Sequence, residues 1–296
     1  MEKMQGMNGF LVAAITPFDE EGKLNVPVLY QLMDRTIEQG AIGFLIGGSS
    51  AECPMLSREE RLEGLEAAAK YPGRKKTKLM ASVASISTEE AVIYAKRAKE
   101  LGYDCMISTV PYYYKFSMKA IANYFRALHA ACDLPLFLYN FPGNTGVEID
   151  IYDPDIREIL TDGTIAGVKQ TSLNLSQMER LRALNPNLVI YGGYDEVYLG
   201  ARILGADGAI GSTFNFTLPL FTKIEEAYKA LDIPRAQALQ VRANNVMEAL
   251  VRNGLFPSIK HILNVQGIAC GTCRAPFPTL TDEQKAYVEK VVAENM

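Results

Sequence analysis

The first candidate for chemistry in this chain is Lys169, which follows a short apolar run at 165–168. An apolar run of this kind is typical of a buried parallel strand, and a lysine is seldom buried without a partner or a task. Such a lysine can be a structural cation, or it can be a nucleophile whose ammonium form is destabilised by desolvation, as in Schiff-base chemistry. The residue type alone favours the structural interpretation. The choice between the two roles therefore depends on which side chains lie at the ends of the other predicted strands.

Polar side chains with catalytic potential follow other apolar runs. Tyr139 lies near the end of the run at 134–140, where a phenol could relay protons or pack at a rim. Asp195 and Glu196 follow the run at 188–193, where they could bind substrate or form the acidic first turn of a helix. Further candidates share such a position: Ser49, Ser50, Thr171, Gly193 and Ser212. A lysine with hydroxyls and carboxylates indicates amine chemistry on a polar carbonyl substrate.

Ser49 and Ser50 follow two glycines. Glycine before hydroxyl residues lets backbone N–H groups approach an anion closely, and a helix N-terminus after them would add its dipole. Most Gly-Ser pairs after strands are ordinary turns. The functional interpretation of this pair is that it holds a substrate carboxylate.

The elements that must position these residues alternate between strand and helix. Apolar runs predict eight strands, and amphipathic spacing predicts a helix from 26 and further helices that begin near 57, 88, 117, 151, 175, 195 and 218. The predicted strands are 10–15, 43–48, 78–84, 105–111, 134–140, 165–170, 188–193 and 208–212. This α/β pattern predicts a (β/α)8 TIM barrel, whose reactive groups collect at the carboxyl ends of the strands.

An open doubly wound sheet is the alternative fold. The turn after the first strand lacks the glycine fingerprint that such a sheet uses for a dinucleotide. After about 232 the alternation stops, and helices are predicted at 233–252, 255–268 and 281–294. We therefore expect a barrel domain at 1–232 that holds the active site, and a C-terminal helical extension at 233–296 packed on it.

Composition excludes several classes of function. The net charge of −4 gives no broad basic surface for nucleic acid, and the one tight basic cluster, at 74–78, follows a turn and is interpreted as a solvated loop. No apolar run has the length of a membrane span, and no secretory leader is recognisable, so we expect a cytoplasmic protein.

The cysteines and histidines do not form a metal site in the sequence. Five scattered cysteines are not typical of a disulfide framework, and the spacing of Cys270 and Cys273 matches half of a zinc or redox site without a second pair. We expect reduced thiols and no metal.

The motifs and their order resemble the dihydrodipicolinate synthase/N-acetylneuraminate lyase family of pyruvate-type class I aldolases, from about 10 to 277. The segments that carry the resemblance are Ile15-Thr-Pro-Phe18, the loop 47–52, Pro111-Tyr-Tyr-Tyr114, Tyr139-Asn-Phe-Pro142, Gly167-Val-Lys-Gln-Thr-Ser172, Gly193-Tyr-Asp-Glu196 and 205–213. The resemblance implies a TIM barrel and catalysis through a covalent Schiff base, without a metal or organic cofactor.

The resemblance also implies a role for each candidate. Lys169 would be the Schiff-base lysine, and Tyr139 would relay protons. Ser49 and Ser50 would bind the pyruvyl carboxylate, and Tyr113 would be contributed by the neighbouring subunit of a dimer pair. The residues that would hold a polyhydroxylated substrate tail are Thr171, Gly193, Asp195, Glu196 and Ser212.

Within the family, Asn144 separates the branches. Dihydrodipicolinate synthases carry an arginine in the corresponding Pro-x-Arg-Thr-Gly pattern, and the neutral Asn144 argues against their second substrate. The expected reaction is reversible cleavage of N-acetylneuraminate to pyruvate and N-acetylmannosamine. The alternatives are another pyruvate-dependent aldolase or hydro-lyase acting on a 2-keto-3-deoxy sugar acid, dihydrodipicolinate synthase, and a non-catalytic binding or regulatory protein.

Two further expectations concern the loop at 47–52 and the tyrosine run at 112–114. Ala51 replaces the usual glycine of the family, so if that glycine has a positive φ, either Ala51 is strained or the loop differs slightly. Because alternate side chains at a strand end point to opposite sides, the three tyrosines cannot all face one pocket. We expect a homotetramer built from tight dimers, in which Tyr113 reaches the partner's site.

Overall fold

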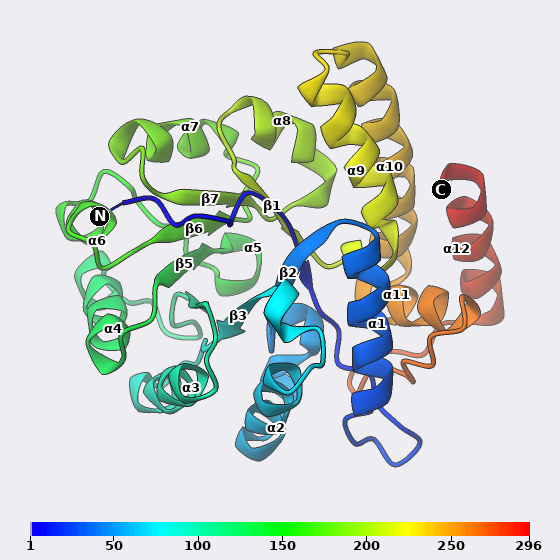
Figure 1. Ribbon diagram of the computed structural model, residues 1–296, viewed down its shortest axis with the longest axis horizontal. Helices are drawn as coiled ribbons and strands as arrows, with labels where there is room; N and C mark the ends of the chain where they lie inside the picture. The colour runs from blue at the N-terminus through cyan, green and yellow to red at the C-terminus, as the bar shows by residue number, and fades with distance from the viewer. Residues whose placement is uncertain (1) are drawn as a thin grey trace.

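The computed structural model describes residues 2–296, in which eight parallel strands close into a barrel (Figure 1). Neighbouring strands pair in chain order, and the last strand pairs with the first. The strands are β1 (Gly9–Ala13), β2 (Ala41–Ile46), β3 (Lys78–Ser82), β4 (Cys105–Thr109), β5 (Leu136–Asn140), β6 (Gly167–Gln170), β7 (Val189–Gly192) and β8 (Gly208–Gly211). The predicted (β/α)8 TIM barrel is confirmed, and the doubly wound alternative is wrong.

Helices on the outside of the barrel connect the strands. They are α1 (Val26–Glu38), α2 (Arg58–Ala69), α3 (Thr88–Glu100), α4 (Met118–Ala131), the short α5 (Pro142–Thr145), α6 (Pro154–Thr161), α7 (Leu175–Leu184), α8 (Tyr198–Ile203) and α9 (Phe214–Lys229). Short 3₁₀ turns follow two strand ends that carry candidate residues: η1 (Ser49–Ala51) and η2 (Cys53–Met55) after β2, and η4 (Asp195–Val197) after β7.

The helix boundaries differ slightly from the predicted ones because capping side chains set them. Ser57 caps α2 in a capping box with Glu60, and α3 begins at Thr88 as predicted, capped by Ser87, whose hydroxyl accepts a hydrogen bond from the Glu90 N–H. The helix predicted near 151 begins at Pro154, where the fixed φ of proline suits a first helical position. The helix predicted near 218 begins earlier, at Phe214.

The register of the barrel places Lys169 between two aromatic residues. Lys169 pairs with Tyr139 on one side and with Tyr191 on the other, and both tyrosines belong to the buried cluster inside the barrel. At Gly167, two residues before Lys169 on the same face, a Cβ would lie 2.3 Å from Phe137 Cε1. Glycine there leaves room for the aromatic layer beneath the lysine.

The C-terminal segment packs on one side of the barrel. It comprises α10 (Ile233–Asn253), α11 (Leu255–Val265) and α12 (Asp282–Asn295). Figure 1 shows α10 alongside α9 and α12 at the outer edge. One apolar cluster contains residues of both parts, among them Ile15 and Phe216 from the barrel and Val246 and Ile259 from the extension. The extension therefore shares buried apolar packing with the segment that follows β1 and with the last barrel helix.

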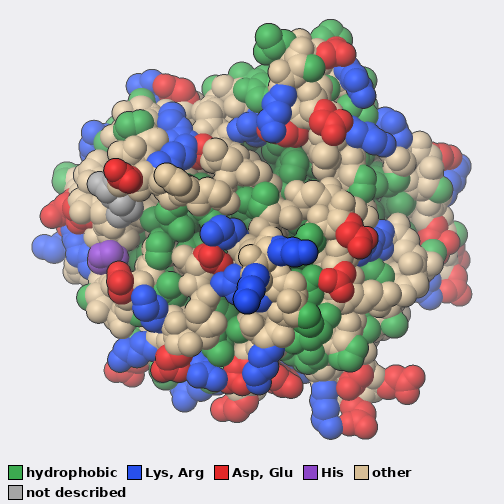
Figure 2. Space-filling model, in the orientation of Figure 1, with side chains coloured by type: hydrophobic (Ala, Val, Ile, Leu, Met, Phe, Trp, Pro, Cys, Tyr) green, Lys and Arg blue, Asp and Glu red, His purple; other side chains and the backbone are tan. Residues whose placement is uncertain are grey.

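The surface agrees with the charge pattern of the sequence. On the face drawn in Figure 2, positive and negative side chains are interspersed. Within the basic cluster, Arg74 and Lys78 both pair with Asp104, at 2.9 and 3.2 Å. None of the helices formed by residues 2–296 combines the length and the apolar composition needed to cross a bilayer.

Candidate active site

Lys169 is buried at the carboxyl end of β6, with 5% of its surface exposed. Its Nζ lies 4.2 Å from the centroid of the Tyr139 ring. Burial lowers the pKa of Lys169 to about 8, and the carboxylate of Asp195 opposes this shift. A substantial fraction of the amine is therefore neutral near physiological pH, as a nucleophilic lysine requires.

Tyr139 forms one wall next to the lysine. Burial raises the pKa of its phenol, while the nearby hydroxyl of Ser49 acts in the opposite direction. The ring stacks on Phe141, with centroids 5.5 Å apart, and Phe141 in turn meets Tyr194 edge-on. The phenol is therefore held in a fixed orientation and stays protonated at neutral pH, so it can give a proton but must receive one back.

The loop after β2 carries Ser49 and Ser50 and places Ser49 beside Tyr139. Both lie in the 3₁₀ turn η1, with Ser50 buried and Ser49 half-buried. The long helix α2 begins only at Arg58, so the predicted helix dipole at the serine pair is wrong. The left-handed backbone of the loop is at Glu52 (φ 61°), while Ala51 belongs to the 3₁₀ turn. The strain expected at Ala51 is absent because the turn places its left-handed residue one position later.

Asp195 brings an incompletely paired carboxylate to the opposite side of the site. One oxygen, Oδ2, accepts a hydrogen bond from Thr213 Oγ1 at 2.6 Å. The other, Oδ1, is buried without a hydrogen-bond partner among the described residues, and so is the hydroxyl oxygen of Thr171. Burial raises the pKa of Asp195 to about 7. A bound molecule with hydroxyl groups could form hydrogen bonds with both of these buried polar groups.

Two glycines allow these groups to approach one another. A Cβ at Gly193 would lie 1.7 Å from Thr171 Oγ1 and 3.1 Å from Lys169 Cε. A Cβ at Gly211 would lie 2.3 Å from Asp195 Oδ1. The side chains of Thr171 and Lys169 therefore occupy the space in which a side chain at Gly193 would lie.

The acidic segment is held from behind by α10. Gln240 Nε2 donates to the carbonyl of Asp195 at 3.1 Å, and Asn244 Nδ2 donates to the carbonyl of Glu196 at 3.1 Å. Ser212 is half-buried on the neighbouring β8 end. Sequence reasoning missed Gln240 and Asn244 because their partners are backbone carbonyls more than forty residues earlier in the chain.

A cavity of about 550 Å³ opens beside Tyr139. Ser49, Tyr112 and Asn144 contribute to its lining. Tyr113 does not, because its side chain is 84% exposed and its backbone has a φ of 82°. A positive φ is unusual for a bulky residue, and it turns the Tyr113 side chain away from the cavity of its own chain.

The other buried lysine, Lys260, has a different environment. Its Nζ is 2.7 Å from Glu52 Oε1, and both side chains are almost fully buried. Lys260 is therefore a paired structural cation. Cys270 and Cys273 are free thiols whose pKa burial raises to about 12 in each case, and residues 2–296 contain no group of three or more acidic, histidine or cysteine side chains placed to hold a metal.

The chain is similar to known proteins over nearly its whole length. N-acetylneuraminate lyase from Citrobacter koseri is 35% identical, over 97% of this chain and 98% of its own length. The protein CdNal from Clostridium difficile, in complex with mannosamine, superposes with a TM-score of 0.93 at 35% identity and covers 98% of this chain and 99% of its own. A dihydrodipicolinate synthase from Bacillus anthracis has the same TM-score of 0.93 at 24% identity, covering 99% of each chain, which shows the fold alone.

Residues 6–295 match the Dihydrodipicolinate synthetase family. The match spans the barrel and the C-terminal helices together, and the relatives are similar over their whole length. On this match and this identity, the chain belongs to the Dihydrodipicolinate synthetase family.

Proposed function

We propose that this protein is a Schiff-base aldolase that cleaves N-acetylneuraminate to pyruvate and N-acetylmannosamine, with Lys169 as nucleophile. The observation that carries the proposal is the buried Lys169 amine, which lies against the face of Tyr139 and has a pKa lowered to about 8. The N-acetylneuraminate lyase from C. koseri, similar over nearly the whole chain, supports the choice of substrate.

The chemistry follows from the neutral amine. Lys169 Nζ adds to the C2 ketone of the open-chain acid, and loss of water gives an iminium. The iminium withdraws the electrons of the C3–C4 bond while the C4 hydroxyl loses its proton, so that the aldehyde of N-acetylmannosamine leaves and an enamine remains. Protonation at C3 and hydrolysis release pyruvate and return the amine, and these steps require no metal or organic cofactor.

Tyr139 is the group that we assign to proton transfer. Its phenol is protonated at neutral pH, so Tyr139 cannot remove a proton as a free base. Instead it accepts one proton as it donates its own, and the substrate carboxylate is the next group in this relay. Ser49, beside Tyr139, and Ser50, the next residue of the same turn, are assigned to that carboxylate. In this assignment, protons pass between the C4 hydroxyl, the substrate carboxylate and the Tyr139 phenol, and return to the enamine that the iminium forms.

The sugar tail is assigned to the opposite side of the site. Asp195 Oδ1 and Thr171 Oγ1 are buried without partners in the part of the chain that the structure describes, and a polyol supplies both donors and acceptors for them. Glu196, Gly193 and Ser212 complete this assignment.

A second candidate substrate is a shorter 2-keto-3-deoxy sugar acid. Asn144, which is exposed at the lining of the cavity, favours it over the substrates of dihydrodipicolinate synthase, because an amide gives no positive charge for a second carboxylate. Parallel assays of N-acetylneuraminate cleavage, 2-keto-3-deoxygluconate cleavage and condensation of pyruvate with aspartate semialdehyde would distinguish the three.

Covalent trapping tests the nucleophile directly. With pyruvate and borohydride, a three-carbon adduct is expected on the peptide that contains Lys169, with loss of activity. Lys169→Ala is expected to lose both the label and turnover while its melting temperature is maintained. A label on Lys260 instead would contradict the assignment.

We further propose a homotetramer made of tight dimers. The exposed aromatic run supports it: Tyr113, Tyr114 and Phe116 expose 84%, 67% and 38% of their surfaces on one chain. Exposed aromatic groups that adjoin one another are typical of an interface. Light scattering that finds a fully active monomer would contradict this assembly.

A further inference from the structure

We infer that the C-terminal extension completes the carboxylate-binding loop through Glu52, so that Lys260 and Arg274 act as positioning residues for Ser49 and Ser50. The inference rests on the proposed function, because it assigns the substrate carboxylate to that loop. Glu52 is two residues after Ser50 and marks the point where the 3₁₀ turn η1 ends.

The Glu52 carboxylate is held by two groups from the end of the chain. Lys260 Nζ, from α11, lies 2.7 Å from Oε1, and the backbone N–H of Arg274 donates to Oε2 at 2.8 Å. The exposed fractions of the Lys260 and Glu52 side chains are 2% and 0%. Lys260 Nζ also donates to the carbonyl of Thr272 at 3.0 Å. The ammonium thus contacts both the extension, at Thr272, and the serine loop, at Glu52.

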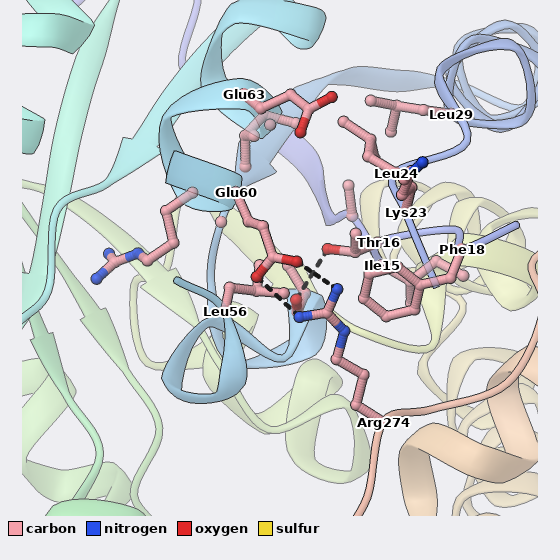
Figure 3. Close-up of a pocket in the computed structure, with 16 residues that line it drawn as sticks. Ile15, Thr16, Phe18, Lys23, Leu24, Leu29, Leu56, Glu60, Glu63 and Arg274 are labelled. Carbon is pink, nitrogen blue, oxygen red and sulfur yellow. Dashed lines mark hydrogen bonds and ion pairs between the residues drawn. The ribbon is translucent and has the colours of Figure 1, made fainter. Parts of the chain in front are cut away.

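The same segment of the extension encloses the turn after β1. Phe18 lies between two cations, with Lys260 Nζ at 4.2 Å and Arg274 Cζ at 4.5 Å from its ring centroid. The Arg274 guanidinium also pairs with Glu60 on α2, at 2.5 Å (Figure 3). Arg274 therefore contacts the first turn of α2 through its guanidinium and Glu52 through its backbone N–H.

Packing alone does not hold the serine loop in place. A cavity of about 240 Å³ lies behind it, and Gly47 and Ala51 belong to its lining together with Thr16 and Leu56 (Figure 3). Besides the contacts of Glu52, Thr16 Oγ1 donates to the Ala51 carbonyl at 2.8 Å on this side of the loop.

The backbone of Glu52 also depends on its side chain. Its φ of 61° is left-handed, which is unfavourable for a residue other than glycine. A left-handed residue persists when its surroundings fix it, and here the fixing contacts are those of the carboxylate. Loss of the charge is expected to loosen the turn that carries Ser49 and Ser50 while Lys169 and Tyr139, on β6 and β5, stay in place.

The decisive measurement is the pyruvate concentration that gives half-maximal borohydride trapping, compared with the maximal trapping rate. For Glu52→Gln we expect the half-saturating concentration to rise about 10- to 100-fold, the range for loss of one or two hydrogen bonds to a charged group. The maximal rate at saturating pyruvate should change less than about threefold, because the amine itself is untouched.

The double variant Glu52→Gln/Lys260→Met separates positioning from folding. Neutralising both partners removes the unpaired buried charge that Glu52→Gln leaves behind, so the melting temperature should recover. The half-saturating pyruvate concentration should stay raised, because the link between loop and extension is still missing. If it returns to the wild-type value together with the melting temperature, the pair is only structural and the inference is wrong.

Glu225→Gln is the matched control. Glu225 pairs with Arg202 at 2.9 Å, is also largely buried, and ties α9 to α8 away from the serine loop. This variant should lower the melting temperature with less than about a twofold change in half-saturation. Wild-type protein that forms no adduct would contradict the proposed function, whereas normal trapping with an unchanged Glu52→Gln half-saturation would contradict this inference alone.

Discussion

Two buried lysines in this chain differ in the partner that each one has. Lys260 Nζ lies 2.7 Å from a carboxylate oxygen of Glu52, whereas Lys169 Nζ lies over the ring of Tyr139, 4.2 Å from its centroid. A carboxylate in contact stabilises the ammonium form, while a ring compensates less of the lost hydration. The same residue type thus forms a buried ion pair in one place, and in the other lies against an aromatic ring with a lowered pKa.

The rate of adduct formation should therefore depend on pH through Lys169. The amine must be neutral to attack, so the rate with pyruvate should rise with pH and level off above an inflection near the pKa of about 8. In Asp195→Asn the inflection should move to lower pH, because the Asp195 charge favours the ammonium form. An inflection at the ordinary lysine value of 10.5 would show that the amine is not desolvated in solution.

Tyr139→Phe tests the proton relay separately from imine formation. The substitution keeps the ring beside Lys169 and removes the phenolic proton, so trapping with pyruvate should continue. Turnover of the sugar acid should fall by roughly 10²–10⁴-fold, the usual effect of losing an acid–base group. Single-turnover trapping and steady-state cleavage, measured on the same preparation, would reveal this difference; an equal loss in both would contradict it.

At the scale of elements, a buried amide network fixes β5 against β6 just outside the site. Asn140 and Gln170 each follow a proposed catalytic residue, and Gln177 on α7 accepts from both, at 3.1 and 2.6 Å. Gln177 Nε2 then donates to the Ile149 carbonyl at 2.8 Å. The network thus connects β5, β6, α7 and the loop at Ile149 through the side chains that follow Tyr139 and Lys169.

Gln177→Leu should consequently destabilise the fold by about 1–3 kcal/mol, because it removes the hydrogen-bond partners of the buried Gln170 amide and of the Ile149 carbonyl. The denaturant midpoint of unfolding measures this change. Gln266→Leu is the control, since Gln266 makes an exposed hydrogen bond to Arg35 and its loss should change stability by less than about 0.5 kcal/mol. Equal effects of the two variants would show that the buried network contributes nothing beyond a surface contact.

Gly193→Ala should abolish most activity, because its methyl group would overlap Thr171 Oγ1 and press on Lys169 Cε. A displacement of this size near the reacting atoms costs on the order of 100-fold in turnover. Gly64→Ala is the contrast: nothing lies within 4 Å of its added Cβ in the middle of α2, so it should stabilise the protein by about 0.5–1 kcal/mol. Assays of turnover and thermal unfolding on both variants would test the pair.

What could be predicted from the sequence was set by local pattern. The strands and most helix starts followed from apolar spacing and capping residues, and the strand ends located the residues around Lys169. The positions of Gln240 and Lys260 could not be predicted, because their hydrogen bonds reach residues far away in the chain. Ala51 illustrates the same limit at short range: the sequence places a residue in a turn without saying which one is left-handed.

At the scale of the whole molecule, complementation tests the proposed sharing of Tyr113. If each site needs Tyr113 of the neighbouring subunit, Tyr113→Ala and Lys169→Ala should each be nearly inactive alone. Co-expressed, half of the dimers should contain one subunit of each kind, and each of these has one complete site, so activity should recover to about a quarter of wild type. Activity no higher than the sum of the separate variants would show that Tyr113 serves its own chain or none.

The ion pair between Glu52 and Lys260 also has a consequence for biosynthesis. At about 5–20 residues per second, a ribosome adds Lys260 roughly 10–40 s after Glu52. During that interval the nascent chain gains its lysine nucleophile and its tyrosine, but the loop that would grip a keto acid has no anchor. Chains that end before Lys260 should therefore bind cellular pyruvate more weakly than the finished protein, so that imine formation at low pyruvate concentrations depends on completion of the C-terminal extension.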